Sequence, residues 1–255
     1  MSVTIKSDAE CDILREGGKK LSSIVDTLCR YVHVGMYTNQ IDQYAQQLIL
    51  ESGGVSAFMG YRPHGVKKPY PASVCVSVNE EIVHGIPGQR MIYEGDIVSI
   101  DCGLKYKGLF TDHARTVIVG SDIHQYGELL SVTEQALDIG IATAVIGNSN
   151  LDIGSSIERF IANRFGIVRE LSGHGVGYAV HEDPYIPNYA MKKAQSVKLK
   201  KNMVLAIEPM LIIGSHKVEF LDDEYTVVSS NGLASAHSED TIIITESGPE
   251  IITRL

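Results

Sequence analysis

Two aspartates lie inside the strand-like arms of a hairpin at residues 99–116, SIDCGLKYKGLFTDHART. With a turn centred on Tyr106 and Lys107, Asp101 would lie directly opposite Asp112. A register slip of one residue would make the two carboxylates diagonal neighbours. Like charges facing each other across a ladder destabilise a sheet, because opposed side chains lie about 4.5–5.5 Å apart. The hairpin therefore predicts that something neutralises these two acids.

Further polar residues interrupt other apolar segments. Glu208 lies within LAIEPMLII, and Glu239 precedes the strand-like run DTIIIT. An ionised carboxylate buried without a partner costs several kcal/mol. Three histidines share this setting, and they are His84 in EEIVHGIPG, His174 in SGHGVG and His181 in AVHEDP.

Any one of these residues, taken alone, is better explained as an ordinary structural residue. The four acids together change that balance, because the lysines and arginines lie mostly in predicted loops. Two divalent cations would balance four carboxylates, and an imidazole would add a neutral ligand. Carboxylate and imidazole ligands suit Mn, Fe, Co or Zn. Two such ions about 3.5–4 Å apart make a hydrolytic centre.

Several other functions are disfavoured by the sequence. HEDPY lacks the second histidine of a zinc-protease helix, and GHGVG is not a dinucleotide-binding pattern. No nucleophile elbow or phosphate-binding loop is present. The net charge of −9 argues against DNA binding. His113 should point away from Asp112, as a surface or sheet-packing residue.

Bulk properties predict a globular protein of the reducing cytoplasm. The chain has 255 residues, 44% of them hydrophobic, and its four cysteines are scattered without metal-type spacing. We find no signal peptide and no apolar run of about 20 residues, so we expect no membrane association. We expect one catalytic domain spanning residues 1–255, because no linker or composition shift divides the chain.

The elements that must position these residues follow from periodicity and caps. A capping box at Ser7 and Glu10 predicts a helix to about Val34, and Thr38 or Asn39 should cap a second helix that stops at residues 53–54. Strand patterns cover residues 74–79, the hairpin and most of the region after residue 200, where Asn202 should adopt a left-handed conformation. Two further helices are predicted at residues 127–145 and 151–165. This pattern indicates an α+β fold, with a curved, mainly antiparallel sheet and helices packed outside it.

Five motifs in order resemble the bacterial, type I methionine aminopeptidases of the pita-bread fold: NEEIVHGIP, the hairpin, GHGVGYAVHEDP, MVLAIEPM and SEDT. The resemblance covers nearly the whole chain. It implies a two-metal centre in which Asp112 and Glu239 bridge both ions and Asp101 chelates one of them. His174 and Glu208 would hold the other ion. His84 and His181 match two histidines that contact substrate.

The resemblance also implies a methionine pocket. Its lining residues would be Tyr61, Tyr70, Cys75 and Tyr225. The chain departs from the common pattern in several ways. The loop at residues 62–69 is longer, Tyr225 stands where tryptophan is frequent, and Phe58, Val180 and Asp240 replace other usual residues.

The implied activity is removal of the initiator methionine from nascent proteins whose second residue is small. Metal-bound hydroxide would attack the first peptide bond, with Glu208 as general base and His84 and His181 assisting. The division of roles between the two histidines stays open. Alternatives are a proline-directed exopeptidase of the same fold, a non-enzymatic pita-bread scaffold or binding protein, and a phosphoesterase.

Two weaker expectations concern binding partners. We also expect a monomer. Residues 192–201 are basic and could touch a ribosome transiently, although a solvated turn explains them better. Asn79 and Ser235 match positions that help hold a monovalent cation in the family. Met1 and Ser2 would suit self-processing.

Overall fold

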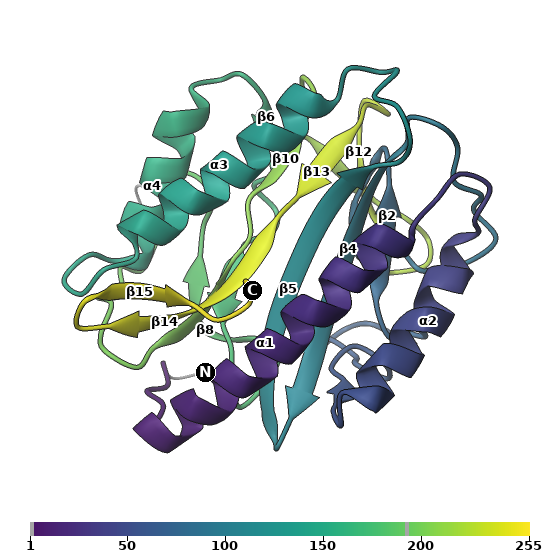
Figure 1. Cartoon of the computed structure of the whole chain (residues 1–255). Coiled ribbons are helices and arrows are strands. Elements are labelled where there is room, and N and C mark those ends of the chain that lie inside the picture. Colours follow the sequence, from purple (N-terminus) through teal and green to yellow (C-terminus); the bar gives the residue numbers. More distant parts are fainter. Residues whose placement is uncertain (1–2, 192–193) are drawn as a thin grey trace.

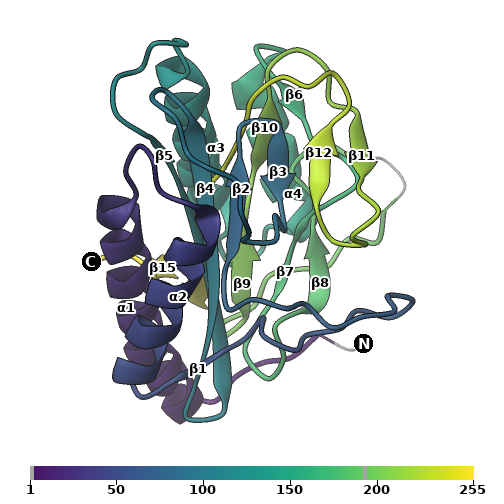
Figure 2. The same cartoon turned by 90° about the vertical axis from the view of Figure 1, so that its right-hand side faces the viewer.

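The computed structural model describes residues 3–191 and 194–255, and it is built around a curved antiparallel sheet. Figures 1 and 2 show helices α1, α2 and α3 covering one side of this sheet, with the β11–β12 hairpin on the other side. The helices are α1 (Asp8–Tyr31), α2 (Thr38–Glu51), α3 (Gly127–Thr143) and α4 (Asn150–Ile161). The expected α+β architecture, a curved antiparallel sheet with helices packed outside it, is confirmed.

Within the described residues, the main sheet has nine strands. Its central path runs β1 (Val55–Ser56), β4 (Ile97–Tyr106), β5 (Leu109–Ile118), β14 (Glu239–Thr245), β9 (Val204–Ile207), β7 (Gly173–Gly175) and β8 (Glu182–Ile186). Two further strands pair at its sides, β2 (Cys75–Val78) with β4 and β15 (Gly248–Ile251) with β14.

Two three-stranded sheets complete the fold. One is β13 (Ser235–His237), β10 (Met210–Ile212) and β6 (Gly166–Ile167). The other is β11 (Val218–Phe220), β12 (Val227–Ser229) and β3 (Glu81–Val83). Two large apolar clusters fill the core, one between α1–α2 and strands β2 and β4, the other between α3–α4 and strands β9 and β14.

Helix boundaries follow local chemistry. The predicted capping box at Ser7 is confirmed. The predicted cap at Thr38 or Asn39 is wrong: Tyr37 is the N-cap of α2, and the Gln40 side chain accepts its backbone N–H at 2.8 Å. Helix α4 stops short of the predicted end because Ala162 adopts a left-handed φ of 49°. Asn202 is left-handed as predicted, with φ 63°.

The hairpin turn lies one residue further along the chain than a turn centred on Tyr106 and Lys107. The two-residue turn is Lys107–Gly108, both with positive φ, which is the backbone that a tight hairpin needs and that glycine supplies. Asp101 therefore pairs with Ala114, and Asp112 pairs with Gly103. The prediction that the two carboxylates lie directly opposite each other is therefore wrong. They are diagonal neighbours, the second arrangement considered.

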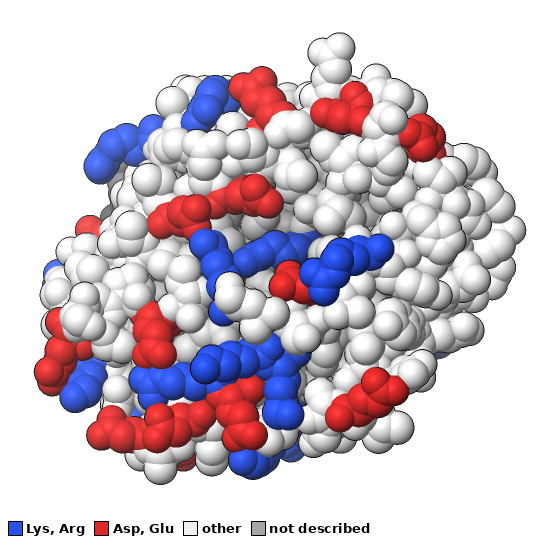
Figure 3. Space-filling model, in the orientation of Figure 1, with Lys and Arg blue, Asp and Glu red and all other residues white. Residues whose placement is uncertain are grey.

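Among the described residues, we find no helix with the length and apolar character needed to cross a membrane. Lys192 and Lys193 of the basic segment, and Met1 and Ser2, lie outside the described residues. On the face shown in Figure 3, acidic and basic side chains are intermingled over α1 and its surroundings.

Candidate metal centre and active site

The candidate site is a cavity of about 310 Å³. The eleven residues predicted as metal ligands, substrate-contacting histidines or methionine-pocket residues all line it, although they come from segments between residues 61 and 239. The fold thus brings together the predicted metal ligands, the two histidines and the predicted methionine pocket. Their roles stay predictions.

Strand register explains why the four acids converge. Ala114 pairs with Asp101 on one side and with Glu239 on the other, so these three side chains lie in a row on one face. Asp112 lies two residues from Ala114 on the same face. Ile207 pairs with Asp240 and Met210 with His237, which places Glu208 opposite Glu239.

Burial makes the ionised form of these acids unfavourable. Asp101, Asp112 and Glu239 are 8%, 4% and 2% exposed. Burial, followed by the neighbouring acids, raises the pKa of Asp101 and of Glu239 well above the usual range. Burial raises the pKa of Asp112 to about 7, although His174 opposes the shift. Oδ1 of Asp101 and Oε1 of Glu239 lack hydrogen-bond partners among the described residues.

The ring of His174 is held by a backbone contact on one side. Its Nδ1 lies 2.9 Å from the carbonyl oxygen of Gly175 and therefore carries the proton, which leaves the Nε2 lone pair free. Burial alone would lower the pKa of His174, but contact with Glu208, whose Oε1 lies 3.3 Å from Nε2, outweighs it and raises the pKa. Ligand atoms of Asp112, His174 and Glu239 all lie within 4.8 Å of one another. This donor set fits a divalent cation of the Mn–Zn range.

The two other predicted histidines flank this group. His84 has a left-handed φ of 59°, a strained backbone of the kind that clusters at functional sites. Burial lowers its pKa to about 4, so the ring is neutral near pH 7. The ring centroid of His181 lies 4.4 Å from that of His174, and its Nδ1 lies 2.7 Å from the hydroxyl of Tyr61.

The predicted methionine pocket adjoins the histidines. Tyr70, Cys75 and Tyr225 belong to one apolar cluster, which also contains Phe58 and Val180. Rings of Tyr70 and Tyr225 meet edge to face at 5.1 Å. The Tyr225 hydroxyl donates to the carbonyls of Lys68 at 2.7 Å and Tyr61 at 3.1 Å. The long loop, which projects near β11–β12 in Figure 2, is thereby held at the pocket.

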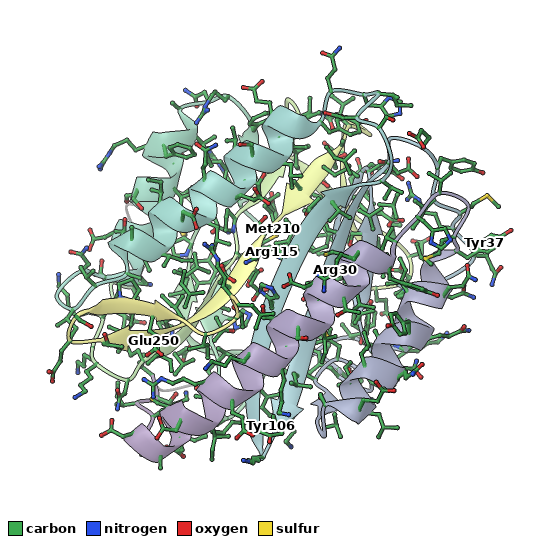
Figure 4. The ribbon with its side chains drawn as sticks, viewed as in Figure 1. Arg30, Tyr37, Tyr106, Arg115, Met210 and Glu250 are labelled. Atoms are coloured by element: carbon green, nitrogen blue, oxygen red, sulfur yellow. The ribbon has the colours of Figure 1, made fainter. Side chains whose placement is uncertain are left out.

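Sequence reasoning missed two features beside the predicted metal ligands. His237 is 1% exposed and lies behind Glu208 and Glu239, and its position two residues before Glu239 in a strand was the signal that could have found it. Asp240 forms a buried ion-pair network with Arg115 and Arg254. Figure 4 shows Arg115 on β5 beside the strand that carries Asp240.

His113, expected at the surface or packed in the sheet, is a buried sheet residue. Its exposed fraction is 1%, and its Nδ1 lies 2.8 Å from the carbonyl oxygen of Glu239. Arg115 also donates to that carbonyl, at 2.8 Å. Both contacts fix the backbone that carries one of the predicted bridging ligands.

Nearly the whole chain is similar to proteins of one known metallopeptidase family. The family model of metallopeptidase family M24 matches residues 12–246. A methionine aminopeptidase from Clostridium perfringens is 40% identical over 98% of both chains, and methionine aminopeptidase 1 from Bacillus subtilis is 41% identical over 99% of this chain and 100% of its own. The crystal structure of a methionine aminopeptidase from Thermotoga maritima superposes with a TM-score of 0.93 at 36% identity, covering 100% of both chains.

The chain therefore belongs to metallopeptidase family M24. Within that family it is a methionine aminopeptidase, a metal-dependent exopeptidase, because full-length relatives of that activity are 34–41% identical to it. A prolidase from Pyrococcus furiosus shares the fold, with a TM-score of 0.76, but at 23% identity and over 65% of the prolidase chain.

Proposed function

We propose that this enzyme removes the initiator methionine from nascent polypeptides with a small second residue, using a dinuclear metal centre and one catalytic domain spanning residues 1–255. The observation that carries the proposal is the convergence of four poorly neutralised carboxylates and His174 at one cavity with an aromatic and thiol-lined wall. The four cysteines are free, which is consistent with a cytoplasmic location. Nascent chains are then its natural partners.

Five residues would hold the cations. Asp112 and Glu239 would be shared between two ions, Asp101 would bind one of them, and His174 and Glu208 would bind the other. Bound divalent cations supply an activated water and a polarised peptide carbonyl. The identity of the ions, from Co, Mn, Fe or Zn, depends on supply as well as on these ligands.

Glu208 is the best placed general base. Burial raises its pKa, and contact with His174 offsets part of that rise. A carboxylate with a raised pKa can accept a proton from water and pass it to the leaving amine near neutral pH. Its position opposite Glu239, at the cavity wall, puts this proton transfer beside the proposed metal ligands.

His181 and His84 would act on the peptide bond. If the Tyr61 hydroxyl donates to Nδ1 of His181, the proton of the imidazole resides on Nε2, which can donate to the developing oxyanion. His84, neutral and held by a strained backbone, would contact the scissile amide. The thioether of the substrate would contact Tyr61, Tyr70, Cys75 and Tyr225, since sulfur favours aromatic edges.

One assay tests the proposal. Metal-loaded protein is incubated with Met-Ala-Ser, with Gly-Pro and with p-nitrophenyl phosphate. We expect metal-dependent release of methionine from the first and no turnover of the others. Absence of methionine release would refute the proposed function, and preferential cleavage of Gly-Pro would favour the proline-directed alternative.

A substitution tests the bridging role. Asp112→Asn should lose bound metal and turnover together, whereas Asp12→Asn, on the exposed face of α1, should change neither. Metal content by inductively coupled plasma spectrometry and initial rates are both measured. Full metal content with full activity in Asp112→Asn would exclude a bridging ligand at this position.

A further inference from the structure

His237 is a buried side chain for which the proposed mechanism has no use. The residue is 1% exposed, and neither ring nitrogen has a hydrogen-bond partner among the described residues. Buried polar groups are nearly always hydrogen-bonded, so an unpaired imidazole needs an explanation. The residues that line the cavity do not include His237, so it does not face substrate.

The backbone around His237 is firmly held. Its N–H donates to Oγ1 of Thr116 at 3.1 Å, and the same hydroxyl lies 2.6 Å from the carbonyl oxygen of His237. The hydroxyl of Ser99 lies 2.7 Å from that of Thr116 and extends the contact to β4. His237 also pairs with Met210 across β13 and β10. The position of the ring is therefore set by the sheet.

The ring points at two proposed metal ligands. Nε2 of His237 lies 3.8 Å from Oε2 of Glu208 and 3.9 Å from Oε2 of Glu239. Both separations exceed a hydrogen bond. The carboxylate torsion of glutamate is broad, so a modest rotation brings either oxygen into range. A ring nitrogen that faces two carboxylates carries its proton, because oxygen acceptors on both sides favour that tautomer.

We propose that His237 is a positioning residue of the proposed metal centre, an inference that rests on the proposed function. His237 directs its Nε2–H at the carboxylates of Glu208 and Glu239 and holds them in the orientation that binds cations. Glu208 has a second nitrogen neighbour, Nε2 of His174 at 3.3 Å from its other oxygen. That nitrogen is itself a proposed ligand. Once it binds a cation, His237 is the remaining basic side chain, among the described residues, with a nitrogen within 4.0 Å of the Glu208 carboxylate.

Two substitutions separate hydrogen bonding from shape. His237→Leu fills the space without a donor, and His237→Gln restores a donor on a side chain of similar reach. Metal-free proteins are titrated with Mn²⁺ by calorimetry, and the visible spectrum of each Co²⁺-loaded protein is recorded. His33→Leu, an exposed histidine on another surface, is the matched control.

We expect His237→Leu to weaken Mn²⁺ binding by about 10–100-fold, the usual effect of removing a residue that orients a metal ligand, and to alter the Co²⁺ spectrum. His237→Gln should stay within about threefold of wild type, as should His33→Leu. Thermal unfolding of the metal-free proteins reports whether the leucine variant is folded.

Three results would overturn the proposal. They are wild-type affinity in His237→Leu, equal weakening in His237→Gln and His237→Leu, and an unaltered Co²⁺ spectrum in the leucine variant. If wild-type protein binds Mn²⁺ and releases methionine while His237→Leu behaves normally, only the role of His237 is lost. If wild-type protein binds no cation, the proposed function fails and this inference with it.

Discussion

Asp240→Asn tests the buried ion-pair network behind the proposed metal centre. The Asp240 carboxylate is 0% exposed and accepts hydrogen bonds from Arg115 at 2.8 Å, Arg254 at 2.7 Å and Thr253 at 2.9 Å. Asparagine is nearly the same size but leaves both guanidinium groups without a buried anion. The variant thus removes one charge and little volume.

The pKa shift of Asp240 gives the expected size of the loss in stability. Burial would raise the pKa, but His113 and the two arginines lower it from 3.8 to about 2. A depression of that size corresponds to roughly 2–3 kcal/mol, and breaking a buried ion pair by removing one partner costs about 3–5 kcal/mol. At about 3 kcal/mol, and with roughly 2–4 °C lost per kcal/mol in a chain of this size, we expect Tm to fall by about 6–12 °C.

The pH dependence follows from the sign of the shift. Because the pKa of Asp240 is depressed in the folded protein, its stabilisation is complete above about pH 4 and is lost as the pH falls towards 2. Thermal unfolding of metal-free wild type and Asp240→Asn, followed by circular dichroism, should give curves that converge over that range. Asp138→Asn is the control, since Asp138 also pairs with Arg254 but is 57% exposed, and it should cost less than about 1 kcal/mol.

A Tm within 1–2 °C of wild type would show that the network contributes little stability. A large loss of Tm that persists undiminished at low pH would assign the effect to packing instead of charge. Either result refutes the electrostatic reasoning.

The structure also predicts the effects of three further substitutions on kinetics or stability. Tyr61→Phe removes the hydroxyl 2.7 Å from Nδ1 of His181, so kcat for Met-Ala-Ser should fall roughly tenfold with metal content unchanged, and an unaltered kcat would contradict the role. Tyr225→Phe removes two hydrogen bonds that hold the long loop, so KM should rise about 3–10-fold while kcat is kept, as steady-state kinetics would show. Lys6→Met leaves Glu182 without its buried ion-pair partner, whose Nζ lies 2.7 Å from Oε2. The free energy of unfolding, measured by denaturant titration, should fall by about 3–5 kcal/mol. An unchanged midpoint would exclude the pair as a stabilising contact.

The sequence predicts the fold well, and the acids that interrupt its apolar strands line one cavity in the structure. The sequence alone does not determine which two residues form the hairpin turn. Tyr106-Lys107 and Lys107-Gly108 both look like turns, and only the positive φ of Lys107 and Gly108 decides between them.

His237 was missed for a different physical reason. Its closeness to Glu208 depends on the register in which β13 pairs with β10, which the spacing of apolar residues in the sequence does not set. The cap of α2 depends likewise on the rotamer of Gln40, which no sequence pattern sets.

The most direct test of the central claim is a crystal structure of the Co²⁺-loaded enzyme, with the ions located by anomalous scattering. We predict two ions about 3.5–4 Å apart, each bound to both Asp112 and Glu239. Asp101 should complete one site, and His174 and Glu208 the other. Ions bound elsewhere, or a cavity that stays free of Co²⁺ in protein that releases methionine, would contradict the account.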